Sequence, residues 1–333
     1  MTTIRDVALR AQVSTATVSR ALSADTRVAP ETLSRVLAAA RELNYVPNTV
    51  ARSLRQQRSM TWALIIADVE NPFLTQLTRG VEDVAQSAGY SVLLCNSDES
   101  PDKEDSYLAL AIESRVTGVL ITPTSPDTDI EGLIARDLPV IAMDRPLHHS
   151  KQVDTVLVDT RRAARAAVEG LADAGFRRIG CLTGPRRVFT AEERAVGYRE
   201  GLADAGLVGS AGADELIRYA DYNVAGGRAA AESLLDDTEV DAILVANSLM
   251  TVGLLEVMSE RELSAGKDIH VTTFDDAPWT RLLGAQIAVL PQPAYDVGKA
   301  AAQMLLARLE HPESPARTVM LNVDLGAGRP TPR

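Results

Sequence analysis

From residue 60 onward, short apolar runs alternate with longer stretches that have helical spacing. WALIIA at 62–67 precedes FLTQLTRGVEDVAQSAG at 73–89, and the same alternation resumes at DTVLV, 154–158, and continues to IHVTTF, 269–274. Alternating strands and helices imply right-handed crossovers and parallel sheets covered by helices on both faces. We therefore expect an α/β body with parallel sheets, and a segment of about 270 residues is usually split into two parts.

Polar residues follow several of these apolar runs, at the points where strands should end. Asp144 and Arg145 come directly after PVIAM, Asn247 comes after ILVA, and Asp275 comes after VTTF. Open parallel sheets bind ligands outside the carboxyl ends of their strands. Any one of these residues could equally cap the following helix. Because several occupy equivalent positions, we expect them to converge on one ligand cleft.

Charge is distributed unevenly along the chain, which carries −11 in total. Residues 1–59 hold nine Arg, no Lys and four acidic residues, a net charge of +5, which leaves −16 on the remainder. A short basic segment on an acidic body indicates that only this segment meets a polyanion. Its apolar residues are spaced for a folded core, which disfavours a solvated, disordered tail.

The basic segment has the pattern of three short helices. Thr3 and Asp6 match a capping box ahead of the apolar spacing in TIRDVALRAQ. Ser14 is a suitable N-cap for TATVSRAL, and Pro30 lies in the first turn of a third helix. We expect a small common core, to which the third helix contributes Leu33, Val36, Leu37, Ala40 and Leu43.

The second of these helices, at 15–22, has a face suited to the major groove of DNA. Its outward positions are small and hydroxylated and end in an arginine: Thr15, Ala16, Ser19 and Arg20. Such a helix enters the groove without steric conflict, and an arginine can donate two hydrogen bonds to guanine. A helical segment of this size is by itself a weak signal, so the sequence that follows it matters more.

The segment NYVPNTVARSLRQQRS at 44–59 is that more specific signal. Together with IRDVALRAQVSTATVSRAL at 4–22 and the body motifs in the same order, it resembles the LacI/GalR family of repressors over essentially the whole chain. The resemblance implies a helix-turn-helix head, a hinge that becomes helical on operator DNA, and a body like periplasmic sugar-binding proteins. It also implies that Leu54 enters the minor groove, where an apolar wedge flanked by arginines can kink the duplex.

The resemblance assigns DNA contacts to the second helix, to the end of the third and to the hinge. Base reading falls to the second helix, and phosphate positioning to the residues just after the third. An ordinary basic linker, with Leu54 packed on the body, is the alternative for the hinge. The implied DNA-binding set is Thr15, Ala16, Thr17, Arg20, Tyr45, Asn48, Ala51, Arg52, Leu54 and Arg55.

The resemblance also implies an effector cleft between two lobes of the body. A sugar is the favoured ligand, because paired donors and acceptors beside an aromatic face suit its polar edges and apolar faces. Two arginines could equally clamp an acidic sugar or a phosphate. NSLMTVG at 247–253 and VDT at 158–160 depart from the common family pattern and leave the identity of the ligand open. The implied effector-binding set is Phe73, Asp144, Arg145, Arg194, Tyr222, Asn247, Asp275 and Gln292.

Enzymatic function has no recognisable signature in the sequence. Gly-x-Gly-x-x-Gly, Gly-Lys-Ser/Thr, Gly-x-Ser-x-Gly and HExxH motifs are absent, and the four histidines lack metal-ligand spacing. Cys95 and Cys181 lie in apolar runs, where we expect core residues. We therefore expect no catalytic residue, no metal and no cofactor. An activator or corepressor-dependent regulator with a non-sugar effector is the alternative function, and a sugar-processing enzyme is the least favoured.

We expect the regulator to be a cytoplasmic homodimer, with a higher oligomer left open. One small head offers too little contact area for operator specificity, so two heads should read a palindromic operator. MTTIRDVALR shows no apolar signal core, and no apolar run is long enough to cross a bilayer, so no membrane partner is expected.

The expected domain organisation has three parts, and the third is divided into two lobes. It comprises a helix-turn-helix domain at 1–46, a hinge helix or linker at 47–59 and an effector-binding and dimerisation domain at 60–333, with one lobe at 60–160 plus 293–320 and the other at 161–292 plus the C-terminal tail.

Overall fold

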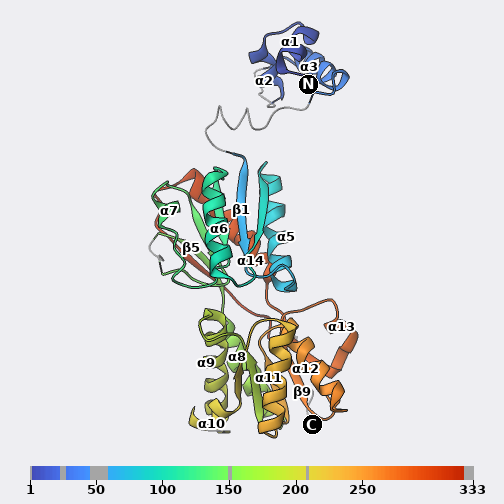
Figure 1. The fold of residues 1–333 in the computed structure, drawn as a ribbon, viewed down its shortest axis with the longest axis vertical. Coiled ribbons are helices and arrows are strands. Elements are labelled where there is room, and N and C mark those ends of the chain that lie inside the picture. Colours follow the sequence, from blue (N-terminus) through green and yellow to red (C-terminus); the bar gives the residue numbers. More distant parts are fainter. Residues whose placement is uncertain (1, 23–27, 46–58, 149–151, 208–209, 326–333) are drawn as a thin grey trace. The chain divides into compact units, whose positions relative to one another are not determined.

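The computed structural model describes residues 2–22, 28–45, 59–148, 152–207 and 210–325. The chain forms two compact units, Met1–Ser59 and Met60–Arg333, here called the head and the body. Figure 1 shows the helical head in dark blue and the body in colours that run from light blue to red. Each unit has its own apolar core, and each is described separately.

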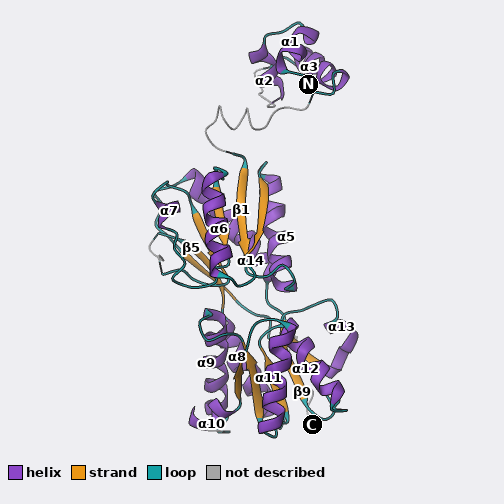
Figure 2. Ribbon diagram, in the orientation of Figure 1, coloured by secondary structure: helices purple, strands orange, loops and turns teal. Residues whose placement is uncertain are grey.

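The described part of the head contains three helices (Figure 2). Both expected caps are confirmed: Asp6 Oδ2 accepts a hydrogen bond from Thr3 N at 2.7 Å, and Ser14 Oγ accepts one from Thr17 N at 3.1 Å. These bonds satisfy backbone N–H groups that a helix start leaves without partners. The helices are α1 (Ile4–Ala11), α2 (Thr15–Leu22) and α3 (Pro30–Glu42).

The core of the head is closed by small side chains of α3. Val36, Ala39 and Ala40 are buried, whereas Leu37 is 37% exposed, so the expectation that Leu37 lies in the core is wrong. Residues 36, 39 and 40 share one helix face at spacings of three and four, and residue 37 is rotated away from that face. Alanines at the contact allow the other two helices to approach α3 closely.

The first lobe of the body is a parallel sheet with helices on both faces. Its strand order is β11-β5-β4-β3-β1-β2, and every strand pairing is parallel. Along β1, Trp62 and Leu64 pack in the same cluster as α5 and α14, whereas Ala63 and Ile65 pack in the cluster of α6 and α7. Both faces of β1 are therefore buried under helices, and this explains why its sequence is a continuous apolar run.

The elements of the first lobe are β1 (Thr61–Ile66), α5 (Pro72–Ser87), β2 (Ser91–Asn96), α6 (Pro101–Glu113), β3 (Gly118–Ile121), α7 (Glu131–Ile134), β4 (Val140–Met143), β5 (Asp154–Val158), α14 (Ala294–Glu310) and β11 (Thr318–Leu321).

The second lobe repeats this plan with a parallel sheet of strand order β10-β9-β8-β6-β7. Leu182 and Ile243 pack in the cluster of α11 and α12, whereas Cys181 and Leu244 pack in the cluster of α8 and α9. Its elements are α8 (Thr160–Asp173), β6 (Ile179–Thr183), α9 (Phe189–Asp204), α10 (Ser210–Glu215), β7 (Ile217–Tyr219), α11 (Val224–Asp237), β8 (Ala242–Val245), α12 (Ser248–Glu260), β9 (His270–Phe274), α13 (Thr280–Leu283), the 3₁₀ helix Gly284–Gln286 and β10 (Ile287–Leu290).

The chain passes from one lobe to the other after β5 and returns after β10 (Figure 1). Beyond β11, Asn322 accepts a hydrogen bond from Arg162 of α8 at 3.2 Å, so the last described residues also touch the second lobe. The segments that link the lobes therefore run beside the carboxyl ends of the strands, where polar residues were expected to gather.

Helices α5 and α14 of the first lobe pack so closely that a glycine is required between them. A Cβ at Gly298 of α14 would lie 2.0 Å from the carbonyl oxygen of Leu77 in α5. The backbone of α14 thus rests directly on α5, and α5 leads from the strand end at residues 68–71 that forms part of the site described next.

Candidate functional site

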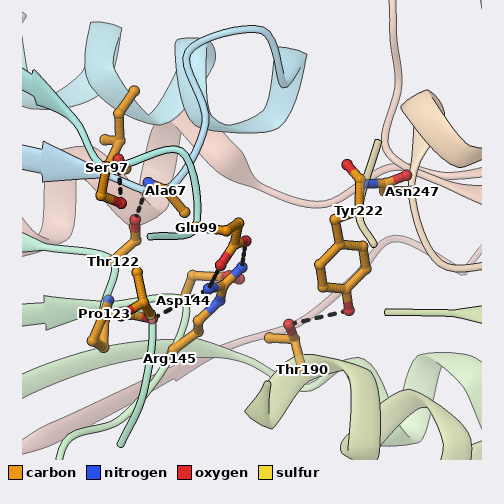
Figure 3. Close-up of polar contacts among 12 residues, drawn as sticks. Ala67, Ser97, Glu99, Thr122, Pro123, Asp144, Arg145, Thr190, Tyr222 and Asn247 are labelled. Carbon is orange, nitrogen blue, oxygen red and sulfur yellow. Dashed lines mark hydrogen bonds and ion pairs between the residues drawn. The ribbon is translucent and has the colours of Figure 1, made fainter. Parts of the chain in front are cut away.

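A polar cavity of about 550 Å³ lies at the carboxyl ends of strands from both lobes. Asp144 directly follows β4 of the first lobe, and Asp275 directly follows β9 of the second. All eight residues of the expected effector set line this one cavity. The structure therefore brings together side chains that are far apart in the sequence, and Figure 3 shows polar contacts among residues around the cavity.

Arg145, on the first-lobe wall, is held by a bidentate ion pair with Glu99 (Figure 3). Arg145 Nη2 lies 2.5 Å from Glu99 Oε1, and Nη1 lies 2.8 Å from Glu99 Oε2. Nη1 also donates to the carbonyl oxygen of Pro123 at 3.2 Å. Burial opposes the charge of the guanidinium, but the carboxylates of Glu99 and Asp144 and the hydroxyl of Tyr222 together outweigh burial and raise the pKa of Arg145. Arg145 is therefore a fixed cation whose two terminal nitrogens already have partners.

Asp144 is a buried carboxylate beside this pair. Its Oδ2 lies 3.6 Å from Arg145 Nε, and its Oδ1 has no hydrogen-bond partner in the part of the chain that the structure describes. Burial raises the pKa of Asp144, and the positive charges of Arg145 and Arg194 partly offset that effect. Its φ of 63° is left-handed, which costs a non-glycine residue about 1–2 kcal/mol. Backbone strain and an unsatisfied oxygen at one residue are typical of a binding site.

Arg194 of α9 lies on the second-lobe wall. Its guanidinium carbon is 4.6 Å from the ring centroid of Phe274, and its Nη1 donates to the hydroxyl of Tyr222 at 3.2 Å. The Tyr222 hydroxyl also lies 3.4 Å from Thr190 Oγ1 (Figure 3). Arg194 Nε has no hydrogen-bond partner among the described residues. The side chain is thus oriented by its neighbours and keeps a donor for a further group.

Asp275 and Gln292 form a second buried pair on the second-lobe side of the cavity. Gln292 Nε2 donates to Asp275 Oδ1 at 2.6 Å, while Gln292 Oε1 lacks a partner within the described ranges. Burial raises the pKa of Asp275 to about 6, although Arg194 and the bond from Gln292 lower it. The φ of Asp275 is 73°, so the aspartates that follow β4 and β9 share the same left-handed backbone.

Asn247 has a structural role as well as a place in the cavity wall. Its Oδ1 accepts from Met250 N at 2.7 Å and caps α12, and its Nδ2 donates to the carbonyl oxygen of Tyr222 at 3.2 Å. Asn247 is therefore one of the residues after a strand that does cap the following helix, as the sequence allowed. Phe73, at the start of α5, is buried and supplies an apolar part of the wall.

Glu99 is the most important cavity residue that the sequence did not single out. It lies in the loop before α6, where both Asp98 and Glu99 have a left-handed backbone, with φ of 50° and 54°. NSDESP at 96–101 has the composition of a turn leading to a helix cap, and that pattern does not indicate which side chain turns inward. Further polar residues of the lining, outside the expected effector-binding set, are Asp68, Glu70, Asn71, Asn96, Asp98, Arg187, Thr190, Asp221 and Asn223.

On the head, the face of α2 that was expected to read bases is open to solvent. Thr15, Ala16 and Arg20 are exposed, and Arg20 Nε donates to the carbonyl oxygen of Ala16 at 3.4 Å. Thr17 is half-buried, and its hydroxyl lies 2.9 Å from Ser14 Oγ at the helix start. Thr17 therefore helps to shape the start of α2, while the other three present their side chains outward.

The remaining expected DNA contacts follow α3. Tyr45 is half-buried and packs against the apolar core of the head. The rest of the set, Asn48, Ala51, Arg52, Leu54 and Arg55, lies outside the described residues, so these assignments stay predictions.

Metal and thiol chemistry find no support in the described residues. No group of three or more His, Cys, Asp and Glu residues there is arranged to hold a metal ion. Cys95 and Cys181 are buried thiols, and burial raises the pKa of Cys181 to about 12, which keeps it protonated. In the same part of the chain, every helix is too short or too polar to cross a membrane.

A helical head with an exposed α2 and a two-lobed body around a polar cavity define the class of ligand-responsive DNA-binding proteins. Residues 3–48 match the model for bacterial regulatory proteins of the lacI family, and residues 59–325 match the model for periplasmic binding proteins and the sugar binding domain of the LacI family. The chain belongs to the LacI family. It is a sequence-specific DNA-binding transcription regulator, which confirms the expected fold class and general function.

Several characterised proteins are similar over nearly the whole chain. The ribose operon repressor of Halalkalibacterium halodurans is 34% identical, covering 93% of this chain and 91% of its own length. The ribose operon repressor of Bacillus subtilis is also 34% identical, covering 92% of this chain and 91% of its own. Among solved structures, the transcriptional regulator CelR in its cellobiose complex is 27% identical, with a TM-score of 0.73 and coverage of 97% of this chain and 98% of its own.

Proposed function

We propose that this regulator is a cytoplasmic repressor that binds a palindromic operator as a homodimer and responds to a small sugar. The cavity carries the effector part of the proposal, because it contains buried polar atoms without partners among the described residues. Arg194 Nε offers a donor, and Asp144 Oδ1 and Gln292 Oε1 offer acceptors. Sugar hydroxyls can both donate and accept, so one polyhydroxylated ligand can satisfy all three.

D-ribose is the first candidate effector. Two relatives at 34% identity are named ribose operon repressors, and the similar regulator CelR has been solved with the sugar cellobiose. The buried ring of Phe73 adds an apolar surface against which one face of a sugar ring can pack.

The exposed face of α2 supports the base-reading part of the proposal. Thr15 and Arg20 contact base edges in the major groove, Ala16 offers at most a methyl contact, and Thr17 lies beside them. Arg20 is the residue that we assign to a guanine, because its fork can donate two hydrogen bonds.

Residues after α3 complete the proposed DNA interface. Their assigned roles are phosphate positioning and a minor-groove wedge, with Leu54 as the wedge itself. The set is Tyr45, Asn48, Ala51, Arg52, Leu54 and Arg55.

Effector binding controls the head through the relative tilt of the two lobes. The cavity lies between groups from both lobes, so a bound sugar favours one tilt and changes the spacing of the two hinges in the dimer. Coupling of this kind is about 1–3 kcal/mol, which changes operator affinity about 5–150-fold. We propose that the effector weakens operator binding and so releases the repressor from DNA. An effector that acts as a corepressor would instead strengthen operator binding.

Operator binding by the full-length protein tests this proposal. The operator is first selected from random DNA, and binding is then measured by fluorescence anisotropy with and without D-ribose. We expect D-ribose to weaken operator binding in the wild type and in Arg199→Ala, a control on α9 whose side chain pairs with Asp214 instead of lining the cavity. Arg194→Ala should bind the operator normally and fail to respond.

The outcomes of this experiment separate the parts of the proposal. Stronger operator binding with D-ribose would identify a corepressor. No response to any sugar, together with no sugar-induced rise in melting temperature, would refute the sugar effector. Operator selection without any palindrome would refute the symmetric dimer.

A further inference from the structure

The effector cavity carries an excess of negative charge. Its lining includes seven acidic residues and three arginines. The arginines are Arg145, Arg187 and Arg194, and they decide whether an anionic ligand can be held, because only they supply positive charge along the described wall. The sequence alone left open whether arginines in the cleft clamp a phosphate or a carboxylate.

Arg145 is already neutralised inside the protein. Its two terminal nitrogens face the Glu99 carboxylate at 2.5 and 2.8 Å, and its Nε lies 3.6 Å from Asp144. A bidentate carboxylate occupies the same fork that a phosphate would use. Glu99 therefore holds the position that an anionic group of a ligand would need.

Arg194 and Arg187 do not provide a replacement. The charge of Arg194 acts on both Asp144 and Asp275, so one guanidinium balances two buried carboxylates. Arg187 is exposed, and water and salt screen an exposed charge strongly. An anion entering the cavity would thus meet three carboxylates, Glu99, Asp144 and Asp275, which outnumber the buried cations Arg145 and Arg194.

We propose that the cavity accepts its sugar only in the uncharged form and rejects the phosphorylated form, and that Glu99 is the specificity-determining residue. The inference rests on the proposed function, since it concerns the ligand class of the same cavity. A phosphate monoester carries about −1.5 to −2 at pH 7. The regulator accordingly reports the free sugar, and the class of reaction that ends its signal is phosphorylation of a sugar hydroxyl.

Isothermal titration calorimetry on the full-length protein tests the discrimination. The probes are D-ribose with D-ribose 5-phosphate and D-glucose with D-glucose 6-phosphate. We expect at least one free sugar to bind about 100-fold or more tightly than its phosphate, because like charges brought together in a buried site oppose binding. A phosphate that binds as tightly as its free sugar, or alone, overturns the inference and leaves a sugar-responsive regulator in place. If none of the four binds, the inference fails together with D-ribose as the effector of the proposed function.

Glu99→Gln tests the assigned residue, because glutamine keeps the shape and removes the charge. We expect the preference for the free sugar, which is its affinity divided by that of its phosphate, to fall about tenfold or more. The reason is that the phosphate binds more tightly to Arg145 once the charge of Glu99 is removed. Asp105→Asn is the matched control: it removes one negative charge from an exposed position on α6, outside the cavity lining, and should leave the ratio unchanged.

The ratio of affinities separates specificity from a loss of structure. A variant that merely loosens the cavity weakens the binding of the free sugar and of its phosphate alike. The preference for the free sugar then stays near that of the wild type, and this result would overturn the role of Glu99. Equal changes in Glu99→Gln and Asp105→Asn would assign the discrimination to overall charge and would also overturn it.

Discussion

Asp275→Asn should make the body more stable at neutral pH while it impairs effector binding. Burial raises the pKa of Asp275 from 3.8 to about 6, and each tenfold change in proton affinity corresponds to about 1.4 kcal/mol. Ionised Asp275 therefore costs the folded state about 3 kcal/mol above pH 7. Asparagine has the same shape, removes this cost and still accepts the bond from Gln292, whose effect is already contained in the pKa of about 6. The expected gain is about 2–3 kcal/mol.

The pH dependence of that gain follows from the direction of the pKa shift. Because the folded-state pKa lies above the unfolded one, the wild type loses stability relative to the variant as pH rises from about 4 to about 6. The gain should therefore be small at pH 4.5 and complete at pH 7.5. Urea unfolding followed by tryptophan fluorescence reports on the body alone, because both tryptophans, Trp62 and Trp279, belong to it.

Asp276→Asn is the matched control for this prediction. Asp276 is the neighbouring residue, is half-buried and pairs with Arg281 at 2.7 Å, so its replacement should give no gain in stability. A variant Asp275→Asn that is less stable than the wild type at pH 7.5, or that gains equally at pH 4.5 and 7.5, would refute the reasoning. The same variant should bind D-ribose about 10–100-fold more weakly, since hydrogen bonds to a charged group contribute about 1.5–3 kcal/mol.

Three other substitutions test the head, the hinge and the packing of the body. Arg20→Ala should relax base preference at one position of each half-site, by about 1–3 kcal/mol, which operator selection with the variant measures; a uniform loss across sequences would reassign Arg20 to phosphate. Leu54→Ala should weaken operator binding and reduce the bend of the DNA in a fluorescence energy transfer assay, and an unchanged bend would remove the wedge role. Gly298→Val should destabilise the body by about 2 kcal/mol or more in urea, because its Cβ would lie 2.0 Å from a carbonyl oxygen of α5; unchanged stability would show that the two helices can separate without cost.

The parallel sheets and the cavity could be predicted because both follow from periodicity. An apolar run marks each buried strand, and the polar residue after it, such as Asp144 or Asp275, must lie at the carboxyl edge of the sheet. Helix faces in the head were less well determined. Leu37 fits an apolar helical pattern, but the neighbouring alanines Ala39 and Ala40 take the core positions, since small residues let the helices pack closely.

Glu99 could not be predicted because its role depends on backbone torsions in a loop. Two consecutive residues with positive φ turn its side chain toward Arg145, and the two residues are 46 positions apart in the sequence. Residue type alone made Arg145 a candidate for holding an anionic ligand. The ion pair with Glu99 is the basis on which we propose the opposite, because it uses the guanidinium within the protein.

The matched positions of Asp144 and Asp275 explain how a small ligand can act as a signal. Each is the first residue after a strand, each has a left-handed backbone, and the two belong to different lobes. A ligand shifts a conformational equilibrium only by the difference between its affinities for the two states. A sugar held by one lobe alone would bind both states equally and would shift nothing. A sugar bonded to both aspartates must lose contacts when the lobes change their tilt, so Asp275→Asn should reduce the operator response at saturating D-ribose as well as the affinity for D-ribose.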